Sequence, residues 1–161
     1  MKKLDSPSVI VVPFSYPDYP IEDINRQIDR SAQALAEAGL QVSRTPAVFT
    51  LDDVPRALET LRSAEHDLIV ALLVSWVEAP LLVATLRPFF SRPLLLWSHT
   101  IYTKNGVGLT LGALPAAGVI RETLEEMEAN FAFVYGMPDE PELMKQILSF
   151  ARPAAAVRAL S

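Results

Sequence analysis

The sequence predicts an α/β fold, a three-layer αβα sandwich built around a five-stranded parallel sheet. Five apolar runs alternate along the chain with segments of helical periodicity. This alternation is typical of parallel strands joined by right-handed crossover helices. Three of the runs are almost continuously apolar, as expected of strands that helices cover on both faces.

The predicted strands are short apolar segments between polar connections. In chain order they are Val9–Phe14, Gln41–Pro46, Leu68–Val74, Leu94–Trp97 and Phe131–Tyr135. The second run is the most polar of the five, which predicts an edge strand. For five such strands the flavodoxin-like order 2-1-3-4-5 is the natural arrangement.

The first helix is predicted from apolar residues at helical spacing, from Ile24 to Leu35, and it ends at Gly39, a residue suited to a helix C-terminus. The second is predicted to begin at Thr50, whose side chain can cap free N–H groups. Two acidic residues follow Thr50 and suit the positive end of the helix dipole. Its buried stripe is formed by Val54, Leu58 and Leu61.

Prolines mark the remaining helices. The third helix is predicted to carry Pro80 in its first turn and to end before Pro88. The fourth covers about 111–128, with a proline in its first turn. The fifth runs from Pro141 towards Arg158, and we expect Pro153 to interrupt or kink it.

Composition predicts a single domain over residues 1–161 and limits its partners. The net charge is −5, and the only basic cluster is at the first three residues, so we expect no nucleic-acid partner. The sequence has no cysteine, which excludes disulfides and thiol catalysis and fits a cytoplasmic location. The apolar segment 68–86 approaches the length of a membrane span, but Glu78 and Pro80 lie near its middle. It therefore predicts a buried strand followed by a short helix, and no membrane contact.

A polar stretch follows the fourth predicted strand, between Leu94 and Gly118. Its hydrogen-bonding side chains are Ser98, His99, Thr100, Tyr102, Lys104 and Asn105. Ligands of open parallel sheets bind outside the carboxyl ends of the strands, so this stretch is a candidate wall of a polar-ligand site. The alternative is an ordinary surface loop with solvated side chains.

Several common activities of such folds are excluded by the strand ends. The turn after the first strand, residues 13–20, contains aromatics and prolines but no glycine, so it cannot form a dinucleotide, flavin-phosphate or P-loop site. The third strand ends at Val74-Ser75-Trp76 without the aspartate of a phospho-receiver domain.

Few side chains suggest catalysis. His66 lies in a polar connection at the opposite edge of the sheet and is predicted to be a solvated loop residue. His99 and Glu78 could share a two-ligand site, although a hydrogen bond between loops would give the same pattern. Trp76 follows the third strand and can offer an apolar face to a sugar ring, or can close the sheet end or pack in a subunit interface. Trp97 is predicted to be core.

The residues that follow the predicted strands resemble a known family. The chain is similar to the N-terminal domain of the L-fucose and L-arabinose isomerase family. The similarity lies in the segments SWVEAP, SHT and TLGALPAAG and in the ending FARPAAAVRALS. The resemblance covers essentially the whole chain as a pattern of elements. It implies a multi-domain, oligomeric enzyme that interconverts aldoses and ketoses with a divalent metal, commonly manganese.

In that family later domains hold the metal, and the first domain helps to close a neighbouring subunit's site. The resemblance therefore implies no catalytic residue, cofactor or metal ligand in this chain. It implies substrate contacts at Ser15 or Tyr16, Trp76 and His99, with helix 141–158 leading to a second domain. With Glu78 and Thr100, which follow the same strands, the predicted substrate-binding residues are Ser15, Tyr16, Trp76, Glu78, His99 and Thr100. The segments Ser75-Trp76-Val77 and Phe14-Ser15-Tyr16 depart from the arabinose and fucose branches respectively, which leaves the sugar open.

Two other hypotheses remain from the sequence. The first is a free-standing flavodoxin-like module that binds a small polar ligand or regulates a partner at the same strand ends. The second is a small independent enzyme that uses His99.

Overall fold

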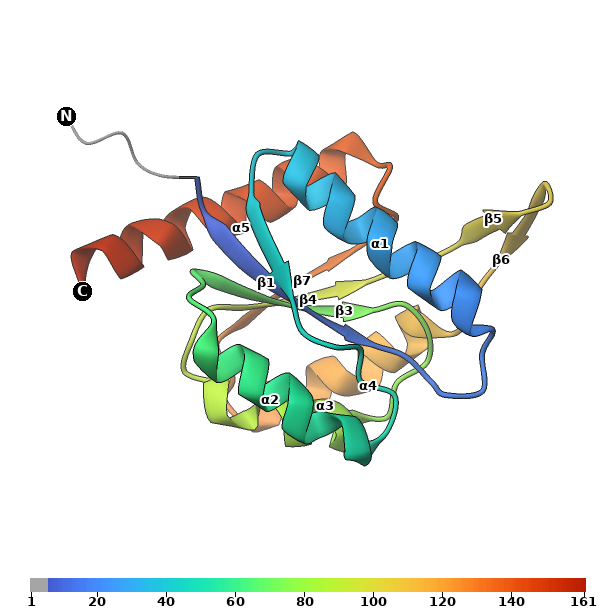
Figure 1. Ribbon diagram of the computed structural model, residues 1–161, viewed down its shortest axis with the longest axis horizontal. Helices are drawn as coiled ribbons and strands as arrows, with labels where there is room; N and C mark the ends of the chain where they lie inside the picture. Colours follow the sequence, from blue (N-terminus) through green and yellow to red (C-terminus); the bar gives the residue numbers. More distant parts are fainter. Residues whose placement is uncertain (1–5) are drawn as a thin grey trace.

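The computed structural model describes residues 6–161 and has the predicted three-layer architecture (Figure 1). The strands of the central sheet are β1 (Ser8–Phe14), β2 (Gln41–Arg44), β3 (Leu68–Leu73), β4 (Leu94–Ser98) and β7 (Phe131–Tyr135). All neighbouring pairs are parallel, and the spatial order is β2-β1-β3-β4-β7. This is the predicted order 2-1-3-4-5, because β7 is the fifth strand of this sheet.

Helices cover both faces of the sheet. They are α1 (Ile21–Glu37), α2 (Val54–Ser63), α3 (Ala79–Leu86), α4 (Ala113–Glu126) and α5 (Pro141–Leu160), with short 3-10 turns at Leu51–Asp53 and Arg87–Phe89. In Figure 1, α1 and α5 lie on one side of the sheet, and α2, α3 and α4 lie on the other.

The core consists of two apolar layers separated by the sheet. Alternate side chains of β1 show the division: Ile10 and Val12 pack towards α2, α3 and α4, whereas Val9 and Val11 pack towards α1 and α5. Every residue of β3 is buried. The continuous apolar runs of the sequence therefore reflect strands covered on both faces.

The helix signals of the sequence are confirmed with small shifts. Gly39 has a φ of 101° and allows the chain to turn after α1. The Asp53 carboxylate accepts hydrogen bonds from the backbone N–H groups of Phe49 and Thr50, at 2.9 and 3.0 Å, which stabilises the entry into α2. The segment 68–86 forms β3 and α3, as predicted.

Two elements differ from the sequence prediction. The helix α5 continues through Pro153, so the expected interruption is wrong. Ala151 and Ala154 pack into the core on either side of the proline, and this packing holds the helix together despite the missing hydrogen bond. The polar stretch after β4 is not a simple loop. It forms a hairpin of β5 (Tyr102–Lys104) and β6 (Val107–Leu109), which projects from the body of the molecule (Figure 1).

Candidate functional site

A cavity of about 290 Å³ lies at the carboxyl edge of the sheet, beside the ends of β1 and β3. Three of the predicted substrate-binding residues line it: Ser15, Tyr16 and Glu78. The other lining residues are Pro17, Phe49, Thr50, Leu51, Val77, Pro80 and Leu81. The structure thus brings the first and third predicted loops together around one hollow, which apolar side chains share with a few polar groups.

Two buried serines join these loops. The Ser75 Oγ accepts a hydrogen bond from the Tyr16 backbone N–H at 2.8 Å, and the Ser15 and Ser75 hydroxyls lie 2.9 Å apart. Both hydroxyls are almost completely buried. Because each hydroxyl also has a backbone carbonyl within hydrogen-bonding distance, the pair is well satisfied and fixes the cavity wall in one arrangement.

Glu78 lies at the start of α3 with an exposed side chain. Glu78 lines the cavity, and a carboxylate can accept hydrogen bonds from ligand hydroxyl groups. Tyr16 is also exposed and packs edge-on against Tyr19, with ring centroids 6.0 Å apart. The lining therefore includes one carboxylate and one aromatic ring, a pairing that suits polyhydroxylated ligands.

Trp76 is placed beside this cavity but does not line it. Its backbone N–H donates to the Leu111 carbonyl at 2.7 Å, and its side chain lies against Gly112. The side chain is 37% exposed. A Cβ at position 112 would lie 3.4 Å from the Trp76 Cβ, and the φ of Gly112 is 78°, so glycine suits this contact. Trp97 is fully buried, as predicted, and its indole N–H donates to the Gly136 carbonyl.

His99 lies away from the cavity, beneath α1. Its ring is only 3% exposed, its Nε2 lies 2.8 Å from the Ser31 Oγ, and it packs edge-on against Trp97. Burial, with a smaller contribution from the Arg30 charge, lowers the pKa of His99 to about 3. The ring is therefore neutral near pH 7. The next residue, Thr100, directs its backbone N–H to the Met137 sulfur.

The hairpin after β4 is held to α1 by one ion pair. The Lys104 Nζ lies 2.7 Å from a carboxylate oxygen of Asp23, which is buried in the first turn of α1. The hydrogen bond from Lys104 is the largest influence on Asp23 and lowers the pKa of its carboxyl group. Asn105 and Gly106, both with positive φ, form the turn. An Asn-Gly pair between short alternating segments is the sequence signal that predicts such a hairpin.

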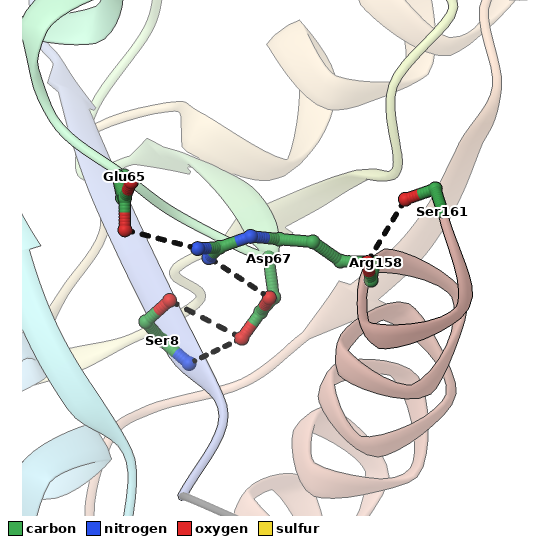
Figure 2. A network of polar contacts seen from close by, with 5 residues as sticks. All are labelled: Ser8, Glu65, Asp67, Arg158 and Ser161. Atoms are coloured by element: carbon green, nitrogen blue, oxygen red, sulfur yellow. Dashed lines mark hydrogen bonds and ion pairs between the residues drawn. The ribbon is translucent and has the colours of Figure 1, made fainter.

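The polar connection around His66 lies at the opposite edge of the sheet. The prediction that His66 is solvated is wrong, because the ring is 8% exposed and its Nε2 faces the Leu61 carbonyl at 3.4 Å. Burial lowers the pKa of His66. Next to it, Arg158 of α5 pairs with Glu65 and Asp67, and Asp67 also accepts hydrogen bonds from Ser8 (Figure 2). A cavity of about 480 Å³ at this edge is partly lined by these residues.

Residues 6–161 contain no group of three or more His, Asp or Glu side chains that could hold a metal ion. The cavity at the carboxyl edge is lined by Glu78, Tyr16 and mostly apolar side chains. Between residues 6 and 161, no helix has both the length and the hydropathy needed to cross a bilayer.

Comparisons with known proteins point to sugar isomerases. No family model matches the chain. The chain is 21% identical over 159 residues to the sulfoquinovose isomerases of Priestia aryabhattai and Priestia megaterium. The alignment covers 98% of this chain but 35% of each relative. The chain thus spans about a third of the length of the curated relatives that it matches.

Proposed function

We propose that this chain is the N-terminal domain of a sugar isomerase of the L-fucose/L-arabinose isomerase type, acting on an aldose–ketose pair. The observation that carries the proposal is the alignment of 98% of the chain with sulfoquinovose isomerases of greater length. The carboxyl-edge cavity supports it, because its polar groups suit a ligand rich in hydroxyls. The substrate is a sugar, and a sulfonated sugar such as sulfoquinovose is one candidate.

In this proposal the chain supplies part of the substrate-binding surface and not the reacting groups. Ser15 and Tyr16 form one wall of the cavity, and Glu78 accepts hydrogen bonds from sugar hydroxyls at its mouth. Trp76 offers an apolar face beside them. The buried His99 packs beneath α1 at the end of β4, and Thr100 begins the connection to the hairpin.

Proton transfer and metal binding belong, in this proposal, to later parts of the polypeptide. A divalent cation, manganese in the resembling family, would polarise the sugar oxygens while a carboxylate base moves the proton. The described residues do not fit a metal site, because they bring no three ligating side chains together. We also propose a homo-oligomer in which the cavity of one subunit borders the site of another.

The proposal is tested with the longer polypeptide that contains this chain. We expect the longer polypeptide to convert an aldose to its ketose in the presence of Mn²⁺, and residues 1–161 alone to be inactive. Glu78→Gln should raise KM by roughly tenfold, because a charged hydrogen-bond acceptor is removed. A tenfold change corresponds to a loss of about 1.4 kcal/mol of substrate-binding free energy. The matched control is Glu59→Gln, an exposed glutamate on α2 outside the cavity.

Two results would contradict the proposal. One is the absence of conversion with sulfoquinovose, L-fucose and L-arabinose. The other is an active Glu78→Gln enzyme whose KM is unchanged. That result would show that the cavity is not part of the substrate-binding site.

The second candidate function is a free-standing binding or regulatory module, and the self-contained cavity favours it. A Trp97→Phe variant leaves Trp76 as the sole tryptophan. Saturable quenching of its emission by a free sugar or anion, with residues 1–161 alone, would favour the module over the isomerase domain.

A further inference from the structure

The cavity at the amino edge of the sheet is larger than the one at the carboxyl edge, about 480 Å³ against about 290 Å³. Three segments line it: the end of α2 with its connection to β3, the residues just before β4, and the last turns of α5. Its volume is within the range of cavities that hold small molecules. The proposed function makes no use of it.

Arginine is the most frequent ionisable residue in the lining of this cavity. Arg62, Arg92 and Arg158 line it, and they come from the three different segments. Two carboxylates, Glu65 and Asp67, accompany them. The whole chain carries a net charge of −5, so this gathering of cations differs from the rest of the protein. Clefts lined by one sign of charge concentrate ions of the opposite sign.

Both carboxylates are already used within the cavity wall. Arg158 pairs with Glu65 and with one oxygen of Asp67, each at 3.1 Å (Figure 2). The other Asp67 oxygen accepts hydrogen bonds from the Ser8 backbone N–H and hydroxyl, at 2.8 and 3.2 Å. This network joins α5 to the starts of β1 and β3, and it neutralises Arg158.

Arg62 and Arg92 have no such partners. Between residues 6 and 161, neither side chain forms an ion pair. The Arg92 guanidinium lies over the Phe89 ring, 5.7 Å from its centroid. That contact consumes none of its N–H donors. The cavity therefore holds two guanidinium groups whose charge no described carboxylate balances.

His66 lies among these charges, in the same lining. Burial is the main cause that lowers the pKa of its ring, and the positive charges of Arg92 and Arg158 lower the pKa further. These guanidinium groups are thus close enough to act on the imidazole. An anion bound between them would act on it in the opposite direction.

The ends of two helices oppose anion binding here. The α2 helix ends at Ser63 and α5 ends at Leu160, and the carbonyl groups of helix C-termini favour cations. Arg62 and Arg158 lie in these last turns and offset that effect, whereas Arg92 belongs to neither helix. The effect of a helix end is also weaker than a charge-assisted hydrogen bond between a guanidinium and an oxyanion. The arginines therefore decide the balance.

We propose that this cavity binds a phosphate dianion, either free or at the end of a small organic molecule. Arg62 and Arg92 donate hydrogen bonds to its oxygens, because the planar, forked guanidinium matches phosphate geometry. A phosphate monoester carries nearly two negative charges at pH 7, so it balances both arginines. Pro93, Ala154 and Val157 supply apolar surface for a carbon chain. The site is independent of sugar isomerisation.

The test follows the two histidine rings of the chain by NMR. Inorganic phosphate, glycerol phosphate and glycerol are added at millimolar concentrations, and chloride keeps the ionic strength constant. We expect both phosphates to shift the His66 resonances saturably and to raise the pKa of His66, because a nearby anion favours the charged ring. His99, at the other edge, should not respond, and neither should His66 respond to glycerol. Tighter binding of glycerol phosphate assigns the site to an organic monoester, and equal binding assigns it to phosphate itself.

Variants identify the groups that bind the anion. Arg62→Gln and Arg92→Gln should each weaken phosphate binding by about tenfold or more, because each removes charge-assisted hydrogen bonds. Both side chains are exposed, so the fold should be retained. The matched control is Arg56→Gln, an exposed arginine of α2 outside the lining, which should bind phosphate as the wild type does.

Three results would overturn the proposal. The first is a His66 ring that shows no saturable response to either phosphate. The second is an equal response to chloride alone, which would indicate general screening. The third is an equal loss of binding in Arg56→Gln and Arg92→Gln.

Discussion

Burial decides the charge of His99. Its ordinary pKa is 6.5, whereas burial beneath α1 lowers the pKa to about 3 in the folded protein. Above pH 6.5 the folded and unfolded states are both neutral at this site. Between pH 6.5 and 3 only the unfolded state binds the proton, so the free energy of unfolding falls as the pH falls.

The first prediction follows from this titration. His99→Phe keeps a ring beside Trp97 but removes the proton-binding group. The wild type should lose about 1.4 kcal/mol of stability per pH unit below 6.5 through this histidine, and the variant should lack that contribution. Urea unfolding at pH 7, 6 and 5 measures the difference. Parallel pH profiles for wild type and variant would contradict the assignment.

Ser75 ties the two loops that border the cavity. Ser75→Ala leaves the Tyr16 backbone N–H and the Ser15 hydroxyl without their partner. We expect the variant to lose about 1–3 kcal/mol of stability, because buried groups that lose a hydrogen bond keep their desolvation cost. Chemical denaturation checks this value. Ser63→Ala, at an exposed hydroxyl on α2, is the control; an equal loss in both variants would contradict the role of Ser75.

At the level of elements, the hairpin β5–β6 depends on its ion pair with α1. An isolated two-stranded hairpin is marginally stable in water, so Lys104 and Asp23 should matter for its position. The pKa of Asp23 in the folded protein is below its ordinary value. The stabilising contribution of the ion pair is therefore fully present at pH values above the ordinary pKa, and it is lost as the pH falls through the pKa of the folded state. Acid should release the hairpin.

Lys104→Met should release the hairpin at neutral pH as well. The amides of residues 102–109 should exchange faster in the variant, and the pKa of Asp23 should rise, because the largest cause of its depression is removed. NMR gives both quantities. Lys145→Met removes a lysine from an exposed ion pair on α5 and serves as control. Unchanged exchange in Lys104→Met would show that other contacts hold the hairpin.

The sequence predicted the main elements well, because each carries a local signal. Continuous apolar runs identify strands buried on both faces, and prolines or glycines mark the helix ends. The hairpin was missed, although Asn105-Gly106 is a local turn signal. The persistence of α5 through Pro153 could not be predicted, because it depends on packing of Ala151 and Ala154 against distant strands.

Of the six candidate site residues, the structure brings three to one cavity. Ser15, Tyr16 and Glu78 share a cavity because strand order places the β1 and β3 ends side by side. His99 follows β4 in the sequence, but its ring turns towards Ser31 of α1, and His66 is buried against Leu61. Which way a side chain leaves a strand end depends on neighbouring elements, so residue type and spacing alone do not reveal it.

On the scale of the whole molecule, the sheet is shared by both apolar layers. Ile10 and Val9 are neighbours in β1 yet belong to opposite layers. If one layer unfolds, it exposes one face of the strands. The other layer packs against the opposite face of these same strands and depends on them. The two layers should therefore unfold together in a single cooperative transition.

The two tryptophans allow a direct measurement. Trp76 lies at the carboxyl edge beside Gly112, and Trp97 lies within the layer of α1 and α5. Trp97→Phe leaves the emission of Trp76 as the probe, and Trp76→Phe leaves that of Trp97. In each variant, we expect the tryptophan emission and the far-UV circular dichroism to change at the same urea concentration. Comparison within each variant removes the effect of the substitution on stability. Separate midpoints for emission and circular dichroism would show that one layer unfolds before the other, and that the sheet does not couple them.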